Sequence, residues 1–407
     1  MILEEKKMME AIDKHKEKIH MVAKKIWEFK EVGWEEFNSS ALLMDELEKE
    51  GFKVQRGLLG KHPKFKQEID MPTAFKAVFH GKKGGPVIGI MLEYDALPNG
   101  HACGHNLIAS AGFAAALGLK EVFQSTGSIV VYGTPAEELE GSKHYILEGG
   151  YMDQVDIMLA SHYGAEWGSE VTGKAIVWPT HDNWLTFKGR SSHASSSPEK
   201  GRSALDAVIL TTMGLEFLRE HMLETNRIHY IISKGGTAAN SVPDLATLNV
   251  ELRTNDSAEL NALMKRVDNV IKGAELMTGT SAIYKWDAPW YCATPVPSLY
   301  KRVAQYAPEL GIDESKFTFG NSPKASSDLG CVAYKIPTVE ITFPIVKENE
   351  PIPVGHADET AELTATDFPI EQSILAGKLM ALAGYRIGTN AEELAQIKHE
   401  FKANYKE

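Results

Sequence analysis

The sequence has few cysteines and no excess of basic residues. Its three cysteines, Cys103, Cys292 and Cys331, are an odd number in a chain of 407 residues, which does not indicate a disulfide framework. The 43 basic residues are outnumbered by 55 acidic ones, and no Lys/Arg cluster could neutralise a row of phosphates, which argues against nucleic acid as the main partner. These features favour a small-molecule or peptide substrate and a reducing compartment.

The sequence also lacks a long hydrophobic run. The longest nearly apolar stretch, Leu107 to Leu119, is too short to span a bilayer, and the first residues lack the apolar stretch of a signal peptide. We therefore expect a cytoplasmic protein that does not associate with membranes. At roughly 150 residues per domain, the chain length predicts two domains.

Four apolar segments are typical of strands that are buried on both faces of a sheet. They are Pro86 to Leu92, Ser128 to Tyr132, Val155 to Ala160 and Pro337 to Phe343. Helical patterns over residues 107–124 and 138–149 separate several of them, and further helical periodicity covers residues 3–51. This alternation predicts an α/β fold with a mainly parallel sheet.

The order of elements changes between residues 182 and 290. Strand patterns at 184–188, 229–233, 246–253 and 281–286 combine with helical patterns at 203–221 and 257–277. The resulting βαββαβ order matches a ferredoxin-like α+β unit, which can be inserted into another domain. We therefore predict a discontinuous main domain over 1–181 and 291–407, interrupted by a lid over 182–290 whose exposed edges allow dimerisation.

Polar side chains follow each of the four predicted strands. In chain order they are Glu93, Asp95, Cys103, His105, Glu137, Glu138, His162 and His356. Ligands of open α/β sheets gather beyond the carboxyl ends of the strands. Thiolate, imidazole and carboxylate groups at one such edge are the ligands of a transition-metal site, with zinc expected first and manganese or cobalt as substitutes.

Each of these residues has an ordinary structural interpretation when taken alone. A histidine at a strand end usually makes a structural hydrogen bond, but the coincidence at four strand ends favours a site. A cysteine nucleophile is the competing chemistry, with Cys103 attacking and His105 as its base, although the spacing of two residues makes their alignment awkward. Glu137 and Glu138 suit different roles, because a metal ligand must stay ionised while a base needs a free oxygen.

Several motifs in order resemble one family of enzymes. They are Tyr94-Asp-Ala-Leu-Pro98, His101-Ala-Cys-Gly-His-Asn106, Pro135-Ala-Glu-Glu138, Gly189-Arg-Ser-Ser-His193-Ala194, Gly201-Arg-Ser-Ala-Leu-Asp-Ala207, Gly235-Gly-Thr-Ala-Ala-Asn-Ser-Val-Pro243 and Leu252-Arg253. Together they resemble the aminoacylase and glutamate-carboxypeptidase family of zinc metallopeptidases. Within that family the chain is most similar to the amidohydrolase branch, which includes aminoacylase-like, hippurate and aminobenzoyl-glutamate hydrolases. The resemblance extends from about Gly33 to Ala383.

The resemblance implies a site with two divalent metal ions. The implied ligands are Cys103, His105, Glu138, His162 and His356. It further implies that Cys103 bridges the ions, that Glu137 is the general base, and that Asp95 supports a ligand through a hydrogen bond.

The resemblance also implies substrate contacts from the inserted unit. His193 would stabilise the developing oxyanion and reach a neighbouring subunit's site, Asn240 would contact substrate, and Arg253 would hold a substrate carboxylate. Without the resemblance, His193 could cap a helix, Arg253 could pair with a surface carboxylate, and Asn240 could be a turn residue.

Two positions depart from the family pattern. Asn106 stands where many relatives have aspartate. The aminobenzoyl-glutamate and aminoacylase-like dipeptidase side of the branch shares this asparagine, which favours substrates of that kind. The motif Gly355-His356-Ala-Asp358 is looser than the His-rich forms of other members, which makes His356 the least secure ligand. His101 is a rival ligand that we interpret as structural or supporting.

The sequence therefore predicts a dinuclear metallohydrolase that cleaves the amide or peptide bond of small N-acyl amino acids or dipeptide-like substrates, as a homodimer or higher homo-oligomer. One alternative is a peptidase with endopeptidase or carboxypeptidase action on longer peptides. Another is a binding protein without catalysis, against which the intact Glu137 and the full ligand set argue.

Overall fold

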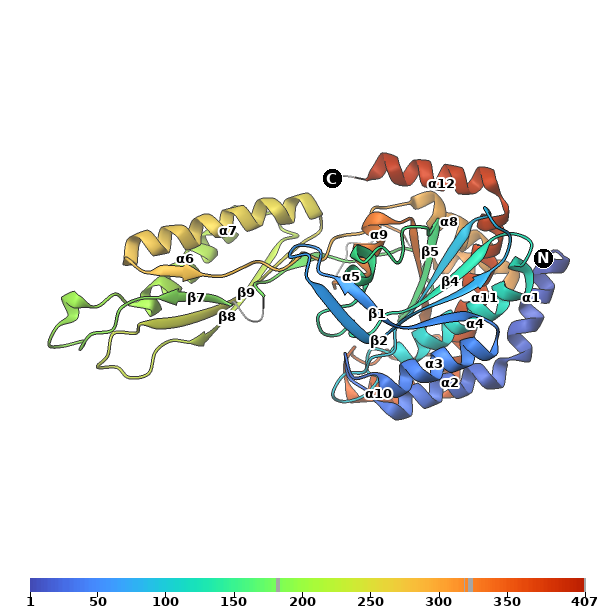
Figure 1. The fold of residues 1–407 in the computed structure, drawn as a ribbon, viewed down its shortest axis with the longest axis horizontal. Coiled ribbons are helices and arrows are strands. Elements are labelled where there is room, and N and C mark those ends of the chain that lie inside the picture. Colours follow the sequence, from blue (N-terminus) through green and yellow to red (C-terminus); the bar gives the residue numbers. More distant parts are fainter. Residues whose placement is uncertain (181–183, 318, 321–324, 406–407) are drawn as a thin grey trace. The chain divides into compact units, whose positions relative to one another are not determined.

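The computed structural model describes residues 1–180, 184–317, 319–320 and 325–405 (Figure 1). The chain forms two compact units. The first comprises Met1–Thr172 together with most of the chain from Ala293 onward, and the second is centred on Gly173–Cys292. The predicted domain boundary at 181–182 lies outside the described residues, so it stays a prediction.

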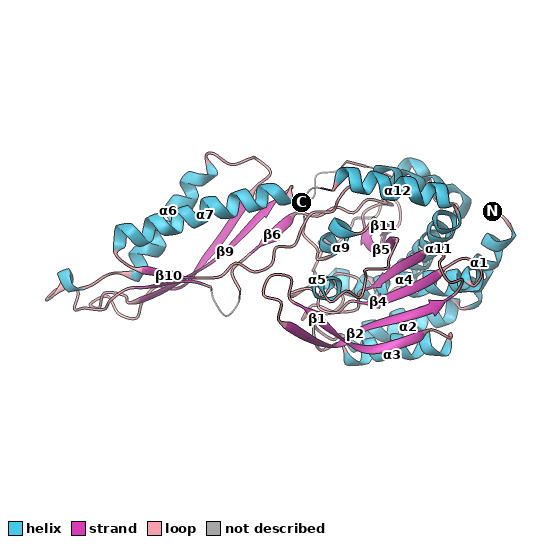
Figure 2. Ribbon diagram, turned by 45° about the horizontal axis from the view of Figure 1, so that its top comes forward, coloured by secondary structure: helices cyan, strands magenta, loops and turns pink. Residues whose placement is uncertain are grey.

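The first unit is built on a six-stranded sheet with the order β1-β2-β4-β3-β5-β11 (Figure 2). Its strands are β1 (Lys53–Lys61), β2 (Glu68–His80), β3 (Val87–Leu92), β4 (Ser128–Gly133), β5 (Ile157–Gly164) and β11 (Thr338–Pro344). The pairs β3–β4, β3–β5 and β5–β11 are parallel, whereas β1–β2 and β2–β4 are antiparallel. The α/β class is confirmed, but β1 and β2 were not predicted from the sequence, and β5 begins a few residues later than predicted.

Helices cover both faces of this sheet, as its buried strands require. The larger core joins one face to α1 (Leu3–Lys14), α2 (Lys16–Phe29), α3 (Phe37–Lys49), α4 (His105–Phe123), α8 (Pro297–Tyr306), α11 (Asp367–Thr389) and α12 (Ala391–Asn404). The opposite face packs against α5 (Lys143–Glu148) and α9 (Leu329–Lys335), and α10 (Asp358–Leu363) follows β11 in the chain. Ile90 and Val131 point into the larger core, whereas Met91 and Val130 point into the other.

Helix α4 is the central helix of the larger core. By length and composition it could cross a membrane, but 83% of its apolar window is buried inside the protein. It packs closely against α11, where a Cβ added at Gly377 would lie 2.5 Å from the carbonyl oxygen of Ala111. The apolar character of α4 is therefore explained by its place in the core.

The second unit is an antiparallel sheet with two helices. The sheet has the order β10-β7-β9-β6, and β8 pairs with the other side of β9. Its elements are β6 (Ala175–Val177), β7 (Leu185–Lys188), α6 (Ala204–Arg219), β8 (Arg227–Lys234), β9 (Leu245–Thr254), α7 (Ser257–Thr278) and β10 (Ser281–Ile283). The helices and the sheet share one hydrophobic core. The predicted βαββαβ order is thus present, with β6 as an additional strand.

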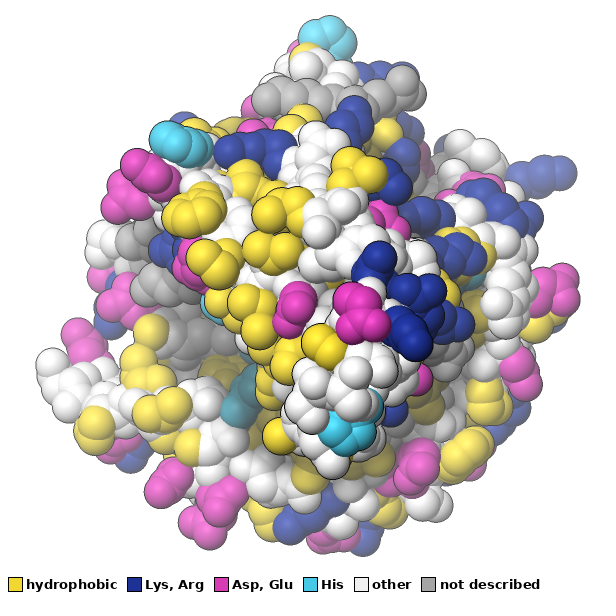
Figure 3. All heavy atoms as spheres, turned by 90° about the vertical axis from the view of Figure 1, so that its left-hand side faces the viewer, with side chains coloured by type: hydrophobic (Ala, Val, Ile, Leu, Met, Phe, Trp, Pro, Cys, Tyr) yellow, Lys and Arg dark blue, Asp and Glu magenta, His cyan; other side chains and the backbone are white. Residues whose placement is uncertain are grey.

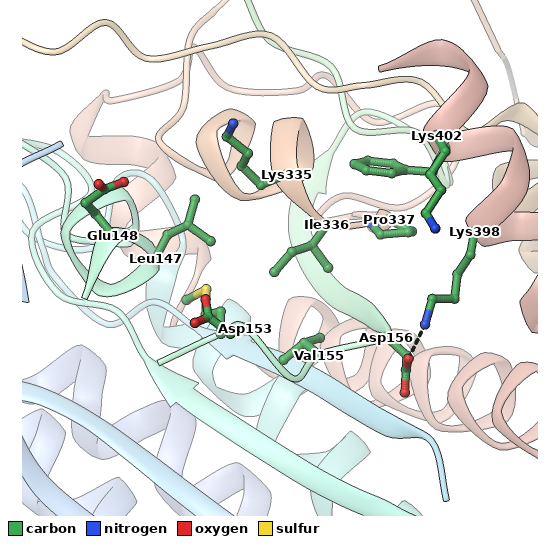
Figure 4. Close-up of a pocket in the computed structure, with 12 residues that line it drawn as sticks. Leu147, Glu148, Asp153, Val155, Asp156, Lys335, Ile336, Pro337, Lys398 and Lys402 are labelled. Atoms are coloured by element: carbon green, nitrogen blue, oxygen red, sulfur yellow. Dashed lines mark hydrogen bonds and ion pairs between the residues drawn. The ribbon is translucent and has the colours of Figure 1, made fainter. Parts of the chain in front are cut away.

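A pocket of about 550 Å³ lies in the first unit where β5 and β11 begin (Figure 4). Six lining residues are apolar and six are charged: Leu147, Met152, Val155, Ile336, Pro337 and Phe401, with Glu148, Asp153, Asp156, Lys335, Lys398 and Lys402. Asp156 and Lys398, which lie together at one edge of the pocket, form an ion pair of 2.5 Å. The side chains predicted to bind metal follow the other ends of these strands, so this pocket lies away from them.

A lysine is completely buried at the start of α5. Lys143 forms ion pairs with Asp328 and with Oε1 of Glu93, the latter at 2.9 Å, and its backbone N–H donates to Oδ2 of Asp328 at 3.0 Å. Burial alone lowers the pKa of a lysine, but the two carboxylates outweigh it and hold the pKa of Lys143 above its usual value. The network therefore contains a charged ammonium group inside the fold.

We predict that Lys143→Met lowers the free energy of unfolding by about 3–5 kcal/mol, because it leaves Asp328 buried without a counter-ion and removes the ammonium partner of Glu93. Urea denaturation of the metal-free protein, followed by circular dichroism, measures this loss. Lys49→Met is the matched control, since Lys49 pairs with Glu46 at 2.6 Å but has a side chain that is 64% exposed. The control should lose less than about 1 kcal/mol. Equal losses in the two variants would contradict the importance of the buried network.

Candidate metal centre

The candidate site forms in the loops that follow the carboxyl ends of the central strands. Its first loop contains Cys103 and His105 on either side of Gly104, which has a left-handed backbone conformation with φ of 67°. A Cβ at Gly104 would also lie 2.7 Å from the ring of Tyr163. Glycine is therefore required at this turn, which places the two potential ligands at the start of α4.

The structure brings the five predicted metal ligands together in the first unit. Their ligand atoms form overlapping groups within which all atoms lie within 4.8 Å of one another. The groups are Cys103, His105 and His162; Cys103, Glu138 and His356; and His105, Glu137 and Glu138. The first two groups share only Cys103. The structure thus has two neighbouring sets of donors with a thiol in common.

Hydrogen bonds fix which nitrogen of each histidine is free. Nδ1 of His105 donates to Oδ1 of Asp95 at 2.9 Å, and Nδ1 of His162 donates to the carbonyl oxygen of Tyr163 at 2.9 Å. In both residues Nε2 is left with a lone pair, and Nε2 of His162 lies 3.6 Å from Sγ of Cys103. Nε2 of His356, whose side chain is 55% exposed, lies 3.4 Å from Oε1 of Glu138. These orientations suit metal coordination.

The chemistry of the donors fits divalent cations. Nε2 of His105 and Oε1 of Glu138 are buried and have no hydrogen-bond partner among the described residues. Burial raises the pKa of the Cys103 thiol, and the carboxylates of Glu138 and Glu137 raise it further. A nearby cation would pair with the orphaned atoms and stabilise the thiolate.

The same observations disfavour a cysteine nucleophile. A thiol whose pKa is raised by burial is a poor nucleophile at neutral pH. His105, its proposed base, is held by Asp95, and these electrostatic contacts raise the pKa of His105 well above its usual value despite its burial. His105 is oriented by Asp95 and shares a donor group with Cys103 and His162, which suits a common metal ion better than a base for the thiol.

Glu137 lies beside the donor groups with one oxygen 4.0 Å from Nε2 of His105. Burial raises the pKa of Glu137, and the neighbouring charge of Glu93 raises it further. Glu138 differs, because its backbone N–H donates to Oδ2 of Asp95 at 2.9 Å and its side chain faces His356. The two adjacent glutamates therefore have different surroundings.

Two residues of the cysteine loop make structural contacts. Nε2 of His101 donates to the carbonyl oxygen of Ile26 at 2.9 Å, and burial lowers the pKa of His101 to about 4. Asn106 is completely buried, and its Nδ2 donates to the carbonyl oxygen of Thr364 at 3.0 Å. An aspartate could not make that bond because a carboxylate has no donor. This hydrogen bond explains why asparagine suits position 106 better than aspartate, which the sequence alone did not indicate.

The three predicted substrate contacts belong to the second unit. Nδ1 of His193 accepts from the backbone N–H of Ser196 at 3.2 Å, and the N–H of Ala194 donates to the carbonyl oxygen of Asn240 at 2.9 Å. The structure therefore brings the loops of His193 and Asn240 together. Arg253 lies near the far end of β9 from these loops and pairs with Glu251 at 2.6 Å. Their roles toward substrate stay predictions.

Two charged residues near the site were missed by the sequence analysis. Lys143 pairs with Glu93, whose other oxygen lies 3.5 Å from Nε2 of His105. Glu36 is completely buried and accepts a hydrogen bond from the backbone N–H of Ala136 at 2.7 Å. The sequence offered only a weak signal for Glu93, which follows a strand, and none for Lys143 or Glu36.

Comparison with known proteins places this geometry in a family. Residues 181–276 match the peptidase dimerisation domain of M20 peptidases. The chain is 30% identical to the Xaa-Arg dipeptidase of Homo sapiens, covering 98% of this chain and 92% of that protein. It is 33% identical to one of the two subunits of the p-aminobenzoyl-glutamate hydrolase of Escherichia coli, covering 76% of this chain and 66% of that protein.

Solved structures share the fold. A putative aminohydrolase from methicillin-resistant Staphylococcus aureus has a TM-score of 0.70 at 20% identity, covering 92% of this chain and 99% of that one. The Bacillus subtilis YXEP protein, described as a dinuclear metal binding peptidase from the M20 family, has a TM-score of 0.63 at 17% identity, covering 91% and 98%. Taken with the near full-length relative, these findings show that the chain belongs to the M20 family of metallopeptidases and amidohydrolases, as its motifs predicted.

Proposed function

We propose that the protein is a dinuclear metal-dependent hydrolase that cleaves the amide or peptide bond of small N-acyl amino acids or dipeptides. The observation that carries the proposal is the pair of donor groups that share Cys103, beside the separate carboxylate of Glu137. The names of the relatives, a dipeptidase and an aminobenzoyl-glutamate hydrolase, support this substrate class.

The ligands of the two ions would be Cys103, His105, Glu138, His162 and His356. We propose zinc, with manganese or cobalt as alternatives, because thiolate and imidazole ligands suit these metals. When bound, such ions supply Lewis-acid polarisation of the scissile carbonyl and make water more acidic.

Residues of the chain would supply proton transfer, orientation of the ligands, oxyanion stabilisation and substrate binding. Glu137 takes a proton from the attacking water and returns it to the leaving amine, and burial raises its pKa, which suits a general base. Asp95 orients His105 and the backbone of Glu138. His193 stabilises the developing oxyanion, and Arg253 holds a substrate carboxylate, with Asn240 as a further substrate contact.

We propose that the second unit pairs two copies of the chain. Figure 3 faces this unit and shows hydrophobic side chains gathered on it. Strand β8 pairs only with β9 among the described strands, which leaves its other edge free. The exposed apolar residues of α6, and those of β8 on the side of the strand that faces α6, are here called the α6–β8 face: Ile209, Met213, Phe217, Tyr230 and Ile232. A free strand edge beside an apolar helix stripe suits a homodimer.

A cytoplasmic location is part of the proposal. None of the three cysteines, all of which the structure describes, forms a disulfide, and Cys103 serves as a proposed ligand. A reducing compartment preserves such a thiol.

The proposed function is tested by a substrate panel. Protein supplied with Zn²⁺, Mn²⁺ or Co²⁺ is assayed with N-acyl amino acids, aminobenzoyl-glutamate, dipeptides that end in arginine or in an apolar residue, and a longer peptide. We expect turnover of at least one small substrate and little cleavage of the longer peptide. Preferred cleavage of the longer peptide would favour the endopeptidase or carboxypeptidase alternative. Binding without turnover of any substrate would favour a non-catalytic protein.

The separate roles of the adjacent glutamates give a second prediction. Glu137→Gln should keep two metal ions per chain and lose at least about 10²-fold in kcat, because general acid–base catalysis contributes ~10²- to 10⁴-fold. Glu138→Gln, the matched variant one residue away, should lose metal because it removes a ligand. Elemental analysis by mass spectrometry measures the metal, and the best substrate of the panel measures kcat. Equal metal loss in both variants would refute the division of roles.

The α6–β8 face gives a third prediction. Phe217, in the last turn of α6, is 67% exposed, and Phe217→Glu should halve the mass in solution from twice 44.9 kDa to 44.9 kDa. Light scattering after size-exclusion chromatography measures the mass. Because His193 is proposed to act in the partner's site, kcat should fall in the same variant while metal content is kept. Leu59→Lys, at an exposed position of β1 in the first unit, is the control and should stay dimeric. A dimeric Phe217→Glu protein would rule out this face.

A further inference from the structure

The carboxylate of Glu36 contacts the loop that carries the general base. Glu36 precedes α3 and is completely buried. Its Oε1 accepts from the backbone N–H of Ala136 at 2.7 Å, and its Oε2 accepts from the hydroxyl of Thr73 at 3.0 Å. Ala136 directly precedes Glu137. A buried side chain from the N-terminal part of the chain is therefore bound to the peptide that leads into the base.

The backbone at Ala136 requires support. Its φ of 59° lies in the left-handed region, which residues with a Cβ disfavour. Its carbonyl oxygen accepts from the N–H of Gly141 at 2.8 Å, which closes a tight turn around the two glutamates. The bond from Glu36 holds the N–H of the same residue, so both polar groups of the Ala136 backbone are occupied.

A second carboxylate holds the other side of the base. The N–H of Glu138 donates to Oδ2 of Asp95 at 2.9 Å. Glu137 therefore lies between two residues, Ala136 and Glu138, whose N–H groups are each bound to a buried carboxylate. The backbone on both sides of Glu137 is thus held in place, which restricts the direction of its side chain.

The turn that carries Glu36 is shaped to fit this loop. A Cβ added at Gly33 would lie 3.0 Å from Cα of Ala136 and 2.8 Å from a methyl carbon of Leu139, so a larger residue would crowd this loop. The carbonyl oxygen of Glu31 accepts from the N–H of Ala96 at 2.7 Å, which ties the same turn to the loop of Asp95. The turn over residues 31–36 is thus attached to both loops that flank the base.

We infer that Glu36 is a positioning residue of the hydrolytic site, which holds the Ala136 peptide so that Glu137 keeps the orientation needed to take a proton from water. This inference rests on the proposed function. It assigns to Glu36 no contact with substrate or metal. Its role is to restrict the backbone next to the base.

The surroundings of Glu36 define the variants that test this role. Burial raises the pKa of Glu36 to about 7, and the nearby charge of Asp95 contributes to the rise. A neutral side chain with the same acceptor oxygen is therefore a close substitute, and Glu36→Gln should keep kcat within a few-fold of the wild type. Glu36→Met has a similar length but no acceptor, so it leaves the N–H of Ala136 unbound.

Glu36→Met should lose kcat on the order of 10²-fold with little change in KM, because a small misplacement of a catalytic group has an effect of this size. It should keep both metal ions, since no ligand is changed. Hydrogen exchange measured by mass spectrometry should show faster exchange in peptides covering residues 133–141. This readout does not depend on turnover. Glu46→Met is the matched control, because Glu46 is also buried on α3 but pairs with Lys18 at 3.1 Å and Lys49 at 2.6 Å.

If Glu36→Met does not fold, Glu36→Asp takes its place, since the shorter side chain withdraws the acceptor but keeps the charge. The same loss of kcat and of exchange protection is then expected. Wild-type kcat in the folded Met or Asp variant, or a Gln variant as impaired as the Met variant, would overturn the positioning role alone. A wild-type protein that hydrolyses no substrate of the panel would overturn the proposed function, and the positioning role with it.

Discussion

The geometry of the site depends on one carboxylate that binds two elements at once. Asp95 lies beyond β3, and its oxygens bind Nδ1 of His105 and the backbone N–H of Glu138, each at 2.9 Å. Because the first bond keeps the proton on Nδ1, Nε2 of His105 is the nitrogen that can bind a metal ion. The second bond fixes the backbone beside Glu137. A single side chain thus couples the orientation of a ligand to that of the base.

The charges around Asp95 are unbalanced in the protein alone. Glu36, Glu93, Asp95 and Asp328 are buried, whereas Lys143 is the one buried lysine or arginine among the described residues. Burying carboxylates without counter-ions is unfavourable. Divalent cations at the donor groups would offset this charge, so metal binding should stabilise the folded state as well as enable chemistry. The buried carboxylates are therefore best understood as negative charges that bound metal cations would neutralise.

The central strands could be predicted from the sequence because burial on both faces produces continuous apolar runs, as in β3 and β4. The antiparallel strands β1 and β2 could not. Strand β1 is an edge strand in which Lys53, Arg56 and Lys61 are exposed, and it contains Gly57, where the pairing with β2 is irregular. Strand β2 contains Pro72. On a sequence, glycine and proline among charged residues indicate a loop.

The candidate ligands could be predicted because each follows a recognisable strand or lies in a recognisable motif. The residues that support them could not, because their partners are remote in the chain: Glu36 is 100 residues from Ala136, and Lys143 is 185 residues from Asp328. In the sequence both look like ordinary charged residues of a helix. Their importance depends on burial, which only the tertiary structure determines.

These remote contacts also explain why α5 is shorter than its periodicity suggests. A helical pattern extends over residues 138–149, but the helix forms only over Lys143–Glu148. The segment before it is held by Glu36 at Ala136 and by Asp95 at Glu138. Between these points and Lys143 the chain turns through Gly141, which has a φ of 68°. The local preference for helix is thus overridden where two adjacent glutamates must present their carboxylates separately, one beside His105 and the other toward His356.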